Sequence, residues 1–399
     1  MKKMISFALA ACMVLSMTAC GGAASTTTSS KAASSTATGA ASSAATGDTI
    51  KIGMLAPLTG EVSVYGLNVS NGAQMAADAV NAAGGVLGKQ VETVLYDEKG
   101  DETEAVNAFN KLVENDKVVA LVGDVTTTPT LAVAQAAQES GIPMITASAS
   151  AQAVTETGEN VFRACFIDPY QGELMANYAA TKLGAKSYAM LYDDTNDYSV
   201  GVAEVFEKTA DAAGMQAVSV QTYQSGTPDF RSQLTEIKDA NPDVLLIPVY
   251  YEDLALITVQ AKELGITAQL LGADGWDGVL GKLDASNKDA VNGAFYCSQY
   301  APESTDPAVQ NFIKDYTAAN GEAPTMFALL GYDAMGMMLQ AIEEAGSTDY
   351  AAVNAAMMKL EYKGLTGTMT FDENRNPVKS AVILTFEDGA TKFVENFGK

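Results

Sequence analysis

Histidine is absent from the 399 residues of this chain. Its absence removes the most common general base, the Ser/His and Cys/His nucleophile pairs, and the most common metal ligand. Cysteine is scarce, and the two in the body of the chain, Cys165 and Cys297, lie far apart without metal-binding spacing. They could form a disulfide outside the cell or stay buried as free thiols. No P-loop and no nucleophile elbow stand in the sequence. We therefore expect a protein that is not an enzyme and that carries no cofactor and no metal.

Positive charge is also scarce. The chain has 24 Lys and Arg against 48 Asp and Glu, a net charge of −24, which becomes −26 if Lys2 and Lys3 are removed with a signal. A chain this acidic is a poor nucleic-acid binder and is repelled by anionic lipid. We expect no nucleic-acid partner.

The first residues have the pattern of a secretion signal. Lys2 and Lys3 precede an apolar run too short to span a bilayer, and small residues stand just before Cys20. The segment Leu-Ser-Met-Thr-Ala-Cys-Gly-Gly is similar to a bacterial lipobox with its leucine displaced by one position. We predict a lipoprotein signal over 1–19, lipidation at Cys20, and an Ala/Ser/Thr-rich flexible tether over 20–47. The alternative is an ordinary signal peptide with an incidental cysteine.

The body of about 350 residues exceeds one comfortable core and predicts two domains. It has no second long apolar segment, so we expect it to be soluble. Short runs rich in Val, Ile and Tyr alternate with amphipathic helical stretches, which indicates βαβ organisation and parallel sheets covered on both faces. The predicted strands are 50–55, 91–97, 119–123, 143–147, 188–192, 216–223, 244–248, 269–272 and 293–300.

Helices are predicted between these strands and after the last of them. They include 72–83, 200–213 and 230–240, then stretches around Phe312, over 326–342 and over 351–360. The end of the chain differs, because 367–371 and 382–386 are each followed by turn residues. We predict antiparallel strands there.

Ligands of open α/β sheets bind at the carboxyl ends of the strands. After the strand 119–123 stands a threonine run, in which Thr127 or Thr128 could cap a helix whose free N–H groups suit a carboxylate. Ser148 and Ser150 follow the next strand and offer hydroxyls beside small residues. Each feature alone could be a plain helix cap or an ordinary loop.

The second half of the body offers a different chemistry at equivalent places. Tyr198 and Tyr250 follow two strands, and Asp274 with Trp276 follows a third. One acid among aromatic faces suits an ammonium group, so the two halves together would hold a zwitterion. The alternative is that the tyrosines are ordinary loop residues and that Asp274 is a solvated surface acid.

In this light the sequence resembles the substrate-binding proteins of branched-chain amino acid ABC transporters, the leucine/isoleucine/valine-binding proteins. The resemblance covers nearly the whole body. It is carried, in order, by Ile52-Gly53, Pro57-Leu58-Thr59-Gly60, Tyr65-Gly66, Asn71-Gly72-Ala73, Ala83-Gly84-Gly85-Val86-Leu87-Gly88, Tyr96-Asp97, Gly141-Ile142-Pro143-Met144-Ile145, Phe162-Arg163, Gln171-Gly172, Tyr250-Tyr251 and Gly331-Tyr332-Asp333-Ala334.

The resemblance implies an α/β, two-lobed Venus-flytrap fold of the periplasmic-binding-protein type I. Each lobe is then a doubly wound, mainly parallel sheet flanked by helices, and three crossovers join the lobes. We place lobe 1 at 48–167 and 299–375, and lobe 2 at 168–298 and 376–399.

The resemblance also assigns roles to particular residues. Thr127 and Ser150 are implied as hydroxyl donors, Ser148 as a backbone contact, and Asp274 as the acid for the ammonium. Three aromatics, Tyr65, Tyr198 and Tyr250, match those around the ligand. Two departures matter: Asp274 stands where a longer Glu is familiar, and Thr126 makes the side-chain pocket more polar than leucine needs.

These observations predict a solute-binding lipoprotein on the outer face of the bacterial cytoplasmic membrane, which binds an amino acid, Leu, Ile or Val, and delivers it to an ABC permease. One alternative is the same fold with another amino acid or a small carboxylate. A hydrolase or transferase is a rival supported only by available carboxylates such as Asp193, Asp194 and Asp274. A sensory ectodomain would need a transmembrane helix, which the sequence lacks.

Overall fold

The computed structural model describes residues 49–398. The predicted signal over 1–19, the lipidation at Cys20 and the tether over 20–47 lie outside the described residues. Within 49–398 no helix is both long enough and apolar enough to cross a membrane.

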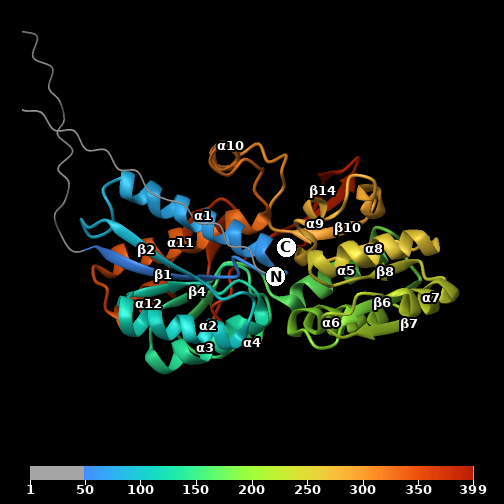
Figure 1. Ribbon diagram of the computed structural model, residues 1–399, viewed down its shortest axis with the longest axis horizontal. Helices are drawn as coiled ribbons and strands as arrows, with labels where there is room; N and C mark the ends of the chain where they lie inside the picture. The colour runs from blue at the N-terminus through green and yellow to red at the C-terminus, as the bar shows by residue number, and fades with distance from the viewer. Residues whose placement is uncertain (1–48, 399) are drawn as a thin grey trace, which may run out of the picture. The chain divides into compact units, whose positions relative to one another are not determined.

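The first of two large sheets is parallel, has five strands, and runs in the order β2-β1-β3-β4-β5. Helices cover both of its faces, with α1 and α11 on one side and α2 and α3 on the other (Figure 1). Its strands are β1 (Ile50–Ala56), β2 (Val91–Asp97), β3 (Ala120–Val122), β4 (Met144–Thr146) and β5 (Val161–Arg163). Its helices are α1 (Ser63–Ala82), α2 (Glu102–Lys111), α3 (Thr127–Ser140), α4 (Ala153–Glu156), α11 (Met326–Ala345) and α12 (Tyr350–Met357). These elements, with the hairpin β11 (Glu361–Gly364) and β12 (Gly367–Thr370), form the first lobe.

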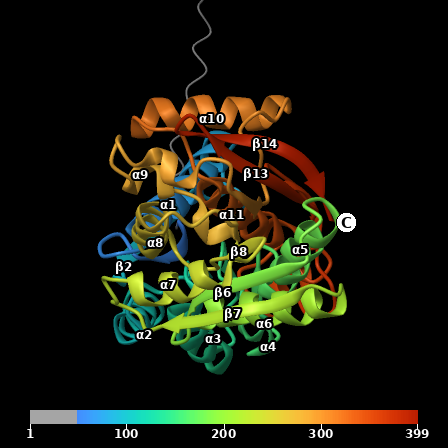
Figure 2. The same ribbon diagram turned by 90° about the vertical axis from the view of Figure 1, so that its right-hand side faces the viewer.

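The second sheet has seven strands in the order β14-β13-β10-β9-β8-β6-β7. Figure 2 shows β6 and β7 crossing in front, with β13 and β14 above them. Its strands are β6 (Ser187–Asp193), β7 (Gln216–Tyr223), β8 (Val244–Leu246), β9 (Gln269–Gly272), β10 (Phe295–Ser298), β13 (Ala381–Glu387) and β14 (Ala390–Phe397). With α5 (Asp168–Thr181), α6 (Asp197–Ala212), α7 (Arg231–Ala240), α8 (Tyr251–Leu264) and α9 (Val279–Lys282) it forms the second lobe, and α10 (Pro307–Asn320) follows β10.

The chain passes between the two sheets three times. It leaves the first sheet after β5 and enters the second at β6, returns after β10 to the helices that pack on β3 and β4, and ends at β13 and β14. The predicted two-lobed α/β fold is confirmed. The residue limits of the lobes stay a prediction.

Several predicted elements differ from the structure in extent or pairing. Helix α1 begins at Ser63 and not at Gly72, because the small and polar residues of its first turns are buried against other elements and do not form an amphipathic stripe. The short strand β5 and the C-terminal strand β14 were not predicted. Strand β12 pairs with β11, and β13 pairs with β10 and β14, so the two predicted C-terminal strands do not pair with each other.

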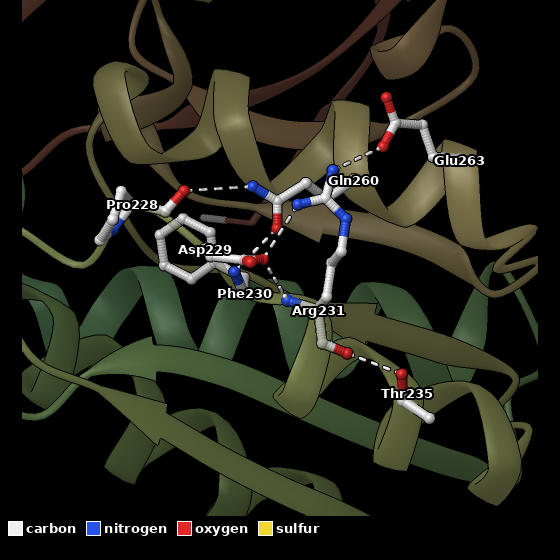
Figure 3. A network of polar contacts seen from close by, with 7 residues as sticks. All are labelled: Pro228, Asp229, Phe230, Arg231, Thr235, Gln260 and Glu263. Carbon is white, nitrogen blue, oxygen red and sulfur yellow. Dashed lines mark hydrogen bonds and ion pairs between the residues drawn. The ribbon is translucent and has the colours of Figure 1, made fainter.

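A buried glutamine joins α7 to α8 in the second lobe (Figure 3). Gln260 on α8 accepts a hydrogen bond from the backbone N–H of Phe230 at 2.7 Å and donates to the carbonyl of Pro228 at 3.3 Å. Arg231 adds an ion pair to Glu263 at 2.9 Å, but both side chains are about half exposed, so this pair contributes little. The glutamine therefore satisfies a backbone donor at the start of α7 that the helix itself leaves free.

Helices α1 and α11 cross at two glycines that allow their backbones to meet. A Cβ added at Gly72 would lie 1.9 Å from the carbonyl oxygen of Ala328, and one at Gly331 would lie 2.2 Å from that of Val69. Neither obstacle is a flexible side chain, so we expect Gly72→Ala to lower the free energy of unfolding by about 3 kcal/mol. Thermal unfolding checks this, with Gly281→Ala as the control, because its Cβ would meet nothing within 4 Å. Equal melting temperatures for the two variants would contradict the expectation.

Candidate ligand-binding site

A narrow cavity of about 240 Å³ lies where strand ends of the two lobes face each other. Eight of the nine residues predicted to bind ligand line it, and Trp276 does not. Its lining consists of Tyr65, Val125, Thr126, Thr127, Ser148, Ser150, Tyr198, Tyr250, Asp274, Gly275 and Phe327. The space open to a water-sized molecule is only about 10 Å³, so the lining side chains of the two lobes lie close together around this cavity.

The first lobe presents the amino end of a helix to this cavity. Thr126 is the N-cap residue of α3, and its own side chain makes no capping hydrogen bond. The expected cap at Thr127 or Thr128 is therefore wrong, since both stand inside the first turn. The backbone N–H groups of that turn have no helical partner, and with the helix dipole they favour an anion.

The two serines of this lobe are held by their own surroundings. The Ser148 hydroxyl donates to the carbonyl of Val125 at 2.7 Å, which fixes the loop before α3. Ser150 accepts the backbone N–H of Asp168 at its carbonyl, and its hydroxyl bonds to the Asp168 carboxyl. Both serines are buried, so the wall facing the helix end is preformed.

The second lobe presents Asp274, which follows β9 and is buried. Burial raises the pKa of its carboxyl to about 6, while hydrogen bonds from Gln171 and Tyr198 act in the opposite direction. Gln171 also accepts the backbone N–H of Asp274 at 2.9 Å, and the Tyr198 hydroxyl accepts that of Gly275 at 2.9 Å. The carboxyl is thus oriented by neutral groups, and it forms no ion pair within residues 49–398.

A second buried acid, Asp168, belongs to the same place and was not predicted. It starts α5, its Oδ2 has no hydrogen-bond partner among the described residues, and burial raises its pKa well above the usual range. The charge of Asp274 acts in the same direction. Asp168 stands between Phe162-Arg163 and Gln171-Gly172, two segments that carry the family resemblance. This position is the feature of the sequence that could have indicated Asp168 as a site residue. A cation between the two acids would lower both pKa values.

Aromatic rings from both lobes form the remaining wall. Tyr198 and Tyr250 stack at 5.0 Å between ring centroids, and Tyr65 lies edge-on to Tyr250 at 5.6 Å. Phe327 from α11, which the sequence did not reveal, stacks on Tyr65 at 4.1 Å. These rings give the cavity an apolar side suited to a hydrocarbon side chain.

Trp276 belongs to the core of the second lobe and not to the cavity. Its Nε1 donates to the carbonyl of Ile247 at 2.7 Å, and its ring lies close to Tyr296 and Phe386. A Cβ at Gly272 would lie 2.0 Å from the indole, so that glycine makes room for it. The prediction that Trp276 binds ligand is wrong, since Trp276 ends the 3₁₀ turn Asp274–Trp276 and its indole packs against Gly272 of β9.

Cys165 and Cys297 are both buried free thiols, so the disulfide alternative is not realised. The Cys297 thiol lies 3.4 Å from Gln171 Oε1, the oxygen that also accepts the Asp274 N–H. Cys297 thereby supports the glutamine that orients the acid.

An open cleft of about 460 Å³ adjoins the cavity and shares Thr126 and Tyr250 with it. Its walls carry four acids and one base from both lobes: Glu61, Asp193, Glu252, Asp253 and Lys99. The negative potential of such a mouth attracts cations and zwitterions more than free anions.

These features define a two-lobed solute-binding protein in which a helix end that favours an anion and a buried acid, Asp274, line one cavity. A sequence profile described as that of the periplasmic binding proteins matches residues 49–390, and the chain belongs to this family, in the branch of branched-chain amino acid ABC transporters. It is a family of binding proteins and not of enzymes, which removes the hydrolase or transferase alternative.

Three relatives illustrate the similarity. The "Leucine-, isoleucine-, valine-, threonine-, and alanine-binding protein" of Pseudomonas aeruginosa is 32% identical over 327 residues, which are 82% of this chain and 86% of that protein. The leucine-binding protein LivK of Thermotoga maritima is 35% identical, with a TM-score of 0.82 over 88% of this chain and 99% of its own. LivJ of Streptococcus pneumoniae, solved with isoleucine, is 31% identical, with a TM-score of 0.81 over 87% and 100%.

Proposed function

We propose that this protein is the substrate-binding lipoprotein of an ABC importer and that it binds a branched-chain amino acid in the cavity between its lobes. The observation that carries the proposal is that Asp274, a buried acid without an ion pair within residues 49–398, lines the same cavity as the amino end of α3. Asp168 is buried close enough to Asp274 for the charge of Asp274 to act on it. A zwitterion satisfies both ends at once. Its carboxylate meets the helix N–H groups with Thr127 and Ser150, and its ammonium meets the acids.

The side chain of the ligand would face Tyr65, Tyr250 and Phe327. Those rings favour Leu, Ile or Val, and the relatives named for these amino acids or solved with isoleucine support the same choice. Thr126 adds a hydroxyl to this wall, which favours a second candidate, a short polar amino acid such as threonine. A carboxylate without an ammonium would leave the acids uncompensated and is disfavoured.

A thermal-unfolding screen of the free amino acids tests the proposal. A ligand present at 100 times its dissociation constant should add about 2.7 kcal/mol to the free energy of unfolding. Leu, Ile and Val should give the largest increases in melting temperature. A screen in which no amino acid raises it would overturn the assignment, and a threonine response above those three would select the second candidate.

Anchoring at Cys20 is the second part of the proposal, supported by the lipobox pattern and by the net negative charge that a tether would hold away from anionic lipid. We expect Cys20→Ser to release the protein from the membrane fraction into the medium. Mass spectrometry of the N-terminal peptide should lose the acyl chains in that variant. Retention in the membrane with unchanged mass would show that Cys20 is not the anchor, and Cys12→Ser serves as the control because Cys12 lies within the predicted signal.

A further inference from the structure

Two buried carboxyls that do not line the cavity stand beside the loop that precedes α3. Glu98 follows β2 and Asp124 follows β3, and both side chains are fully buried. Because β1 lies between β2 and β3 in the sheet, the two side chains face each other across the carboxyl end of β1. The backbone N–H of Glu98 bonds to the carbonyl of Ala56, the last residue of β1, at 3.3 Å.

Each carboxyl uses one oxygen to hold backbone. Glu98 Oε2 accepts the N–H of Gly100 at 2.8 Å, and Asp124 Oδ1 accepts the N–H of Val125 at 2.5 Å. The other oxygens, Glu98 Oε1 and Asp124 Oδ2, receive no N–H or hydroxyl donor from the described residues, and each carboxyl is the side-chain hydrogen-bond partner of the other. Two ionised carboxylates cannot share that contact, since a hydrogen bond between them needs a proton.

No cation from residues 49–398 forms an ion pair with either of these carboxyls. The charged group that acts on each carboxyl is the other one. The charged neighbours on the same segment are Asp97, Lys99 and Asp101, while the end of β1 and the first turn of α3 carry no charged side chain. Burial and mutual repulsion raise the pKa of Glu98, and burial raises that of Asp124.

We infer that Glu98 and Asp124 share one proton and that this proton holds the Val125–Thr127 loop in the form that binds the ligand carboxylate. The loop depends on Asp124 through the bond to the Val125 N–H and through the Asp124 carbonyl, which accepts the Thr146 hydroxyl at 2.6 Å. Loss of the proton to solvent leaves two adjacent carboxylates. They repel each other and place a second negative charge behind the anion site. Both acids are positioning residues, and the inference rests on the proposed function for its ligand.

The test compares wild type with Glu98→Gln, whose amide keeps a donor toward Asp124 at every pH. Leucine affinity is measured by calorimetry from pH 6.5 to 9.5. We expect wild type to lose about tenfold more affinity over this range than Glu98→Gln. A tenfold loss corresponds to a difference of about one unit between the pKa of the carboxyl pair in the ligand-free protein and its pKa in the leucine complex. The ammonium of leucine titrates in the same way for both proteins, so it cancels in the ratio. Glu102→Gln, on the exposed start of α2, should follow wild type.

A ligand-free series separates this inference from the proposed function. The folded state holds a proton that the unfolded state releases above its ordinary carboxyl pKa, so the wild-type free energy of unfolding falls as pH rises. The melting temperature of Glu98→Gln relative to wild type should therefore increase with pH.

Parallel affinity profiles of the two proteins, or a difference in melting temperature that stays constant with pH, would overturn the inference. If no amino acid binds wild type, the proposed function fails, while the thermal series still decides whether the proton is shared. Asp124→Asn should flatten the profile in the same way and replaces Glu98→Gln if that variant does not fold.

Discussion

Asp274→Asn should weaken leucine binding by roughly a hundredfold or more. The substitution keeps the size of the side chain and its hydrogen bonds to Gln171 and Tyr198, but it removes the charge that opposes a buried ammonium. Leaving one member of a buried ion pair without its partner costs about 3–5 kcal/mol. Calorimetry with leucine and with its des-amino analogue, 4-methylpentanoate, measures the loss. Wild type should strongly prefer leucine, and the variant should lose most of that preference.

Two comparisons make this result specific. Thr127→Val and Ser150→Ala each remove one hydroxyl among several donors to the carboxylate, so each should cost only about 1.5–3 kcal/mol and leave the preference for leucine intact. Asp284→Asn, at an exposed position after α9, should bind like wild type. Tight leucine binding by Asp274→Asn would assign the ammonium to Asp168 instead.

The pH dependence has a definite sign. Asp274 in the empty protein has a pKa of about 6 and binds the ammonium only when ionised. The affinity of wild type for leucine should therefore fall as pH decreases below about 6, because protons compete with the ammonium. Asp274→Asn should not show this decrease with the same midpoint.

The sequence reveals much of this site because several of its residues directly follow strands that can be predicted. Thr126, Ser148 and Asp274 each follow a strand that the alternation of apolar runs predicts well, and parallel strands bring such residues to one edge. Asp168 was missed because it follows β5, a buried strand of three residues that shows no alternation. Phe327 lies on a long buried helix, where one aromatic ring among many apolar residues has no distinguishing pattern.

The wrong prediction at Trp276 has a different origin. A sequence position after a strand gives the place of the backbone but not the direction of the side chain. Here Gly272 opens a space under β9, and the indole turns into it to reach the carbonyl of Ile247. Likewise, β13 pairs on one side with β10, a strand distant in the sequence, so the turn residues alone did not determine its partners.

The closed arrangement of the lobes depends on hydrogen bonds that the sequence could not reveal. The Tyr65 hydroxyl on α1 donates to the carbonyl of Gly275 and accepts the N–H of Tyr251 at 3.1 Å, so it joins the first lobe to the second. The Tyr251 hydroxyl donates to the carbonyl of Glu61 at 2.6 Å in the opposite direction. Asp277 Oδ2 accepts the N–H of Met326 at 2.6 Å. Each bond links backbone of one lobe to a side chain of the other and must break when the lobes separate.

Tyr65→Phe should weaken leucine binding by about thirty- to several-hundred-fold, because the substitution makes closure of the lobes less favourable. The phenyl ring keeps the contacts with Tyr250 and Phe327, but the Gly275 carbonyl and the Tyr251 N–H lose their partner only when the lobes are closed. In an open form, water would satisfy both groups. If each unpaired group costs about 1–2 kcal/mol, together they should shift the open–closed equilibrium by about 2–4 kcal/mol. Calorimetry measures the affinity, and small-angle scattering with and without leucine should show a larger compaction on binding in the variant, because its ligand-free form is more open.

Tyr316→Phe is the matched control for this prediction. Its hydroxyl on α10 donates to Asn68 Oδ1 on α1 at 3.0 Å, and both residues are buried. Helix α10 also packs on α11 of the first lobe, where the rings of Phe312 and Tyr332 lie 5.2 Å apart between centroids. Removing that bond should lower the melting temperature without changing leucine affinity, since the bond is present whether the lobes are open or closed. The two variants thus separate a loss of stability from a loss of closure. Wild-type affinity in Tyr65→Phe, or equal affinity losses in both variants, would show that the Tyr65 hydroxyl does not control closure.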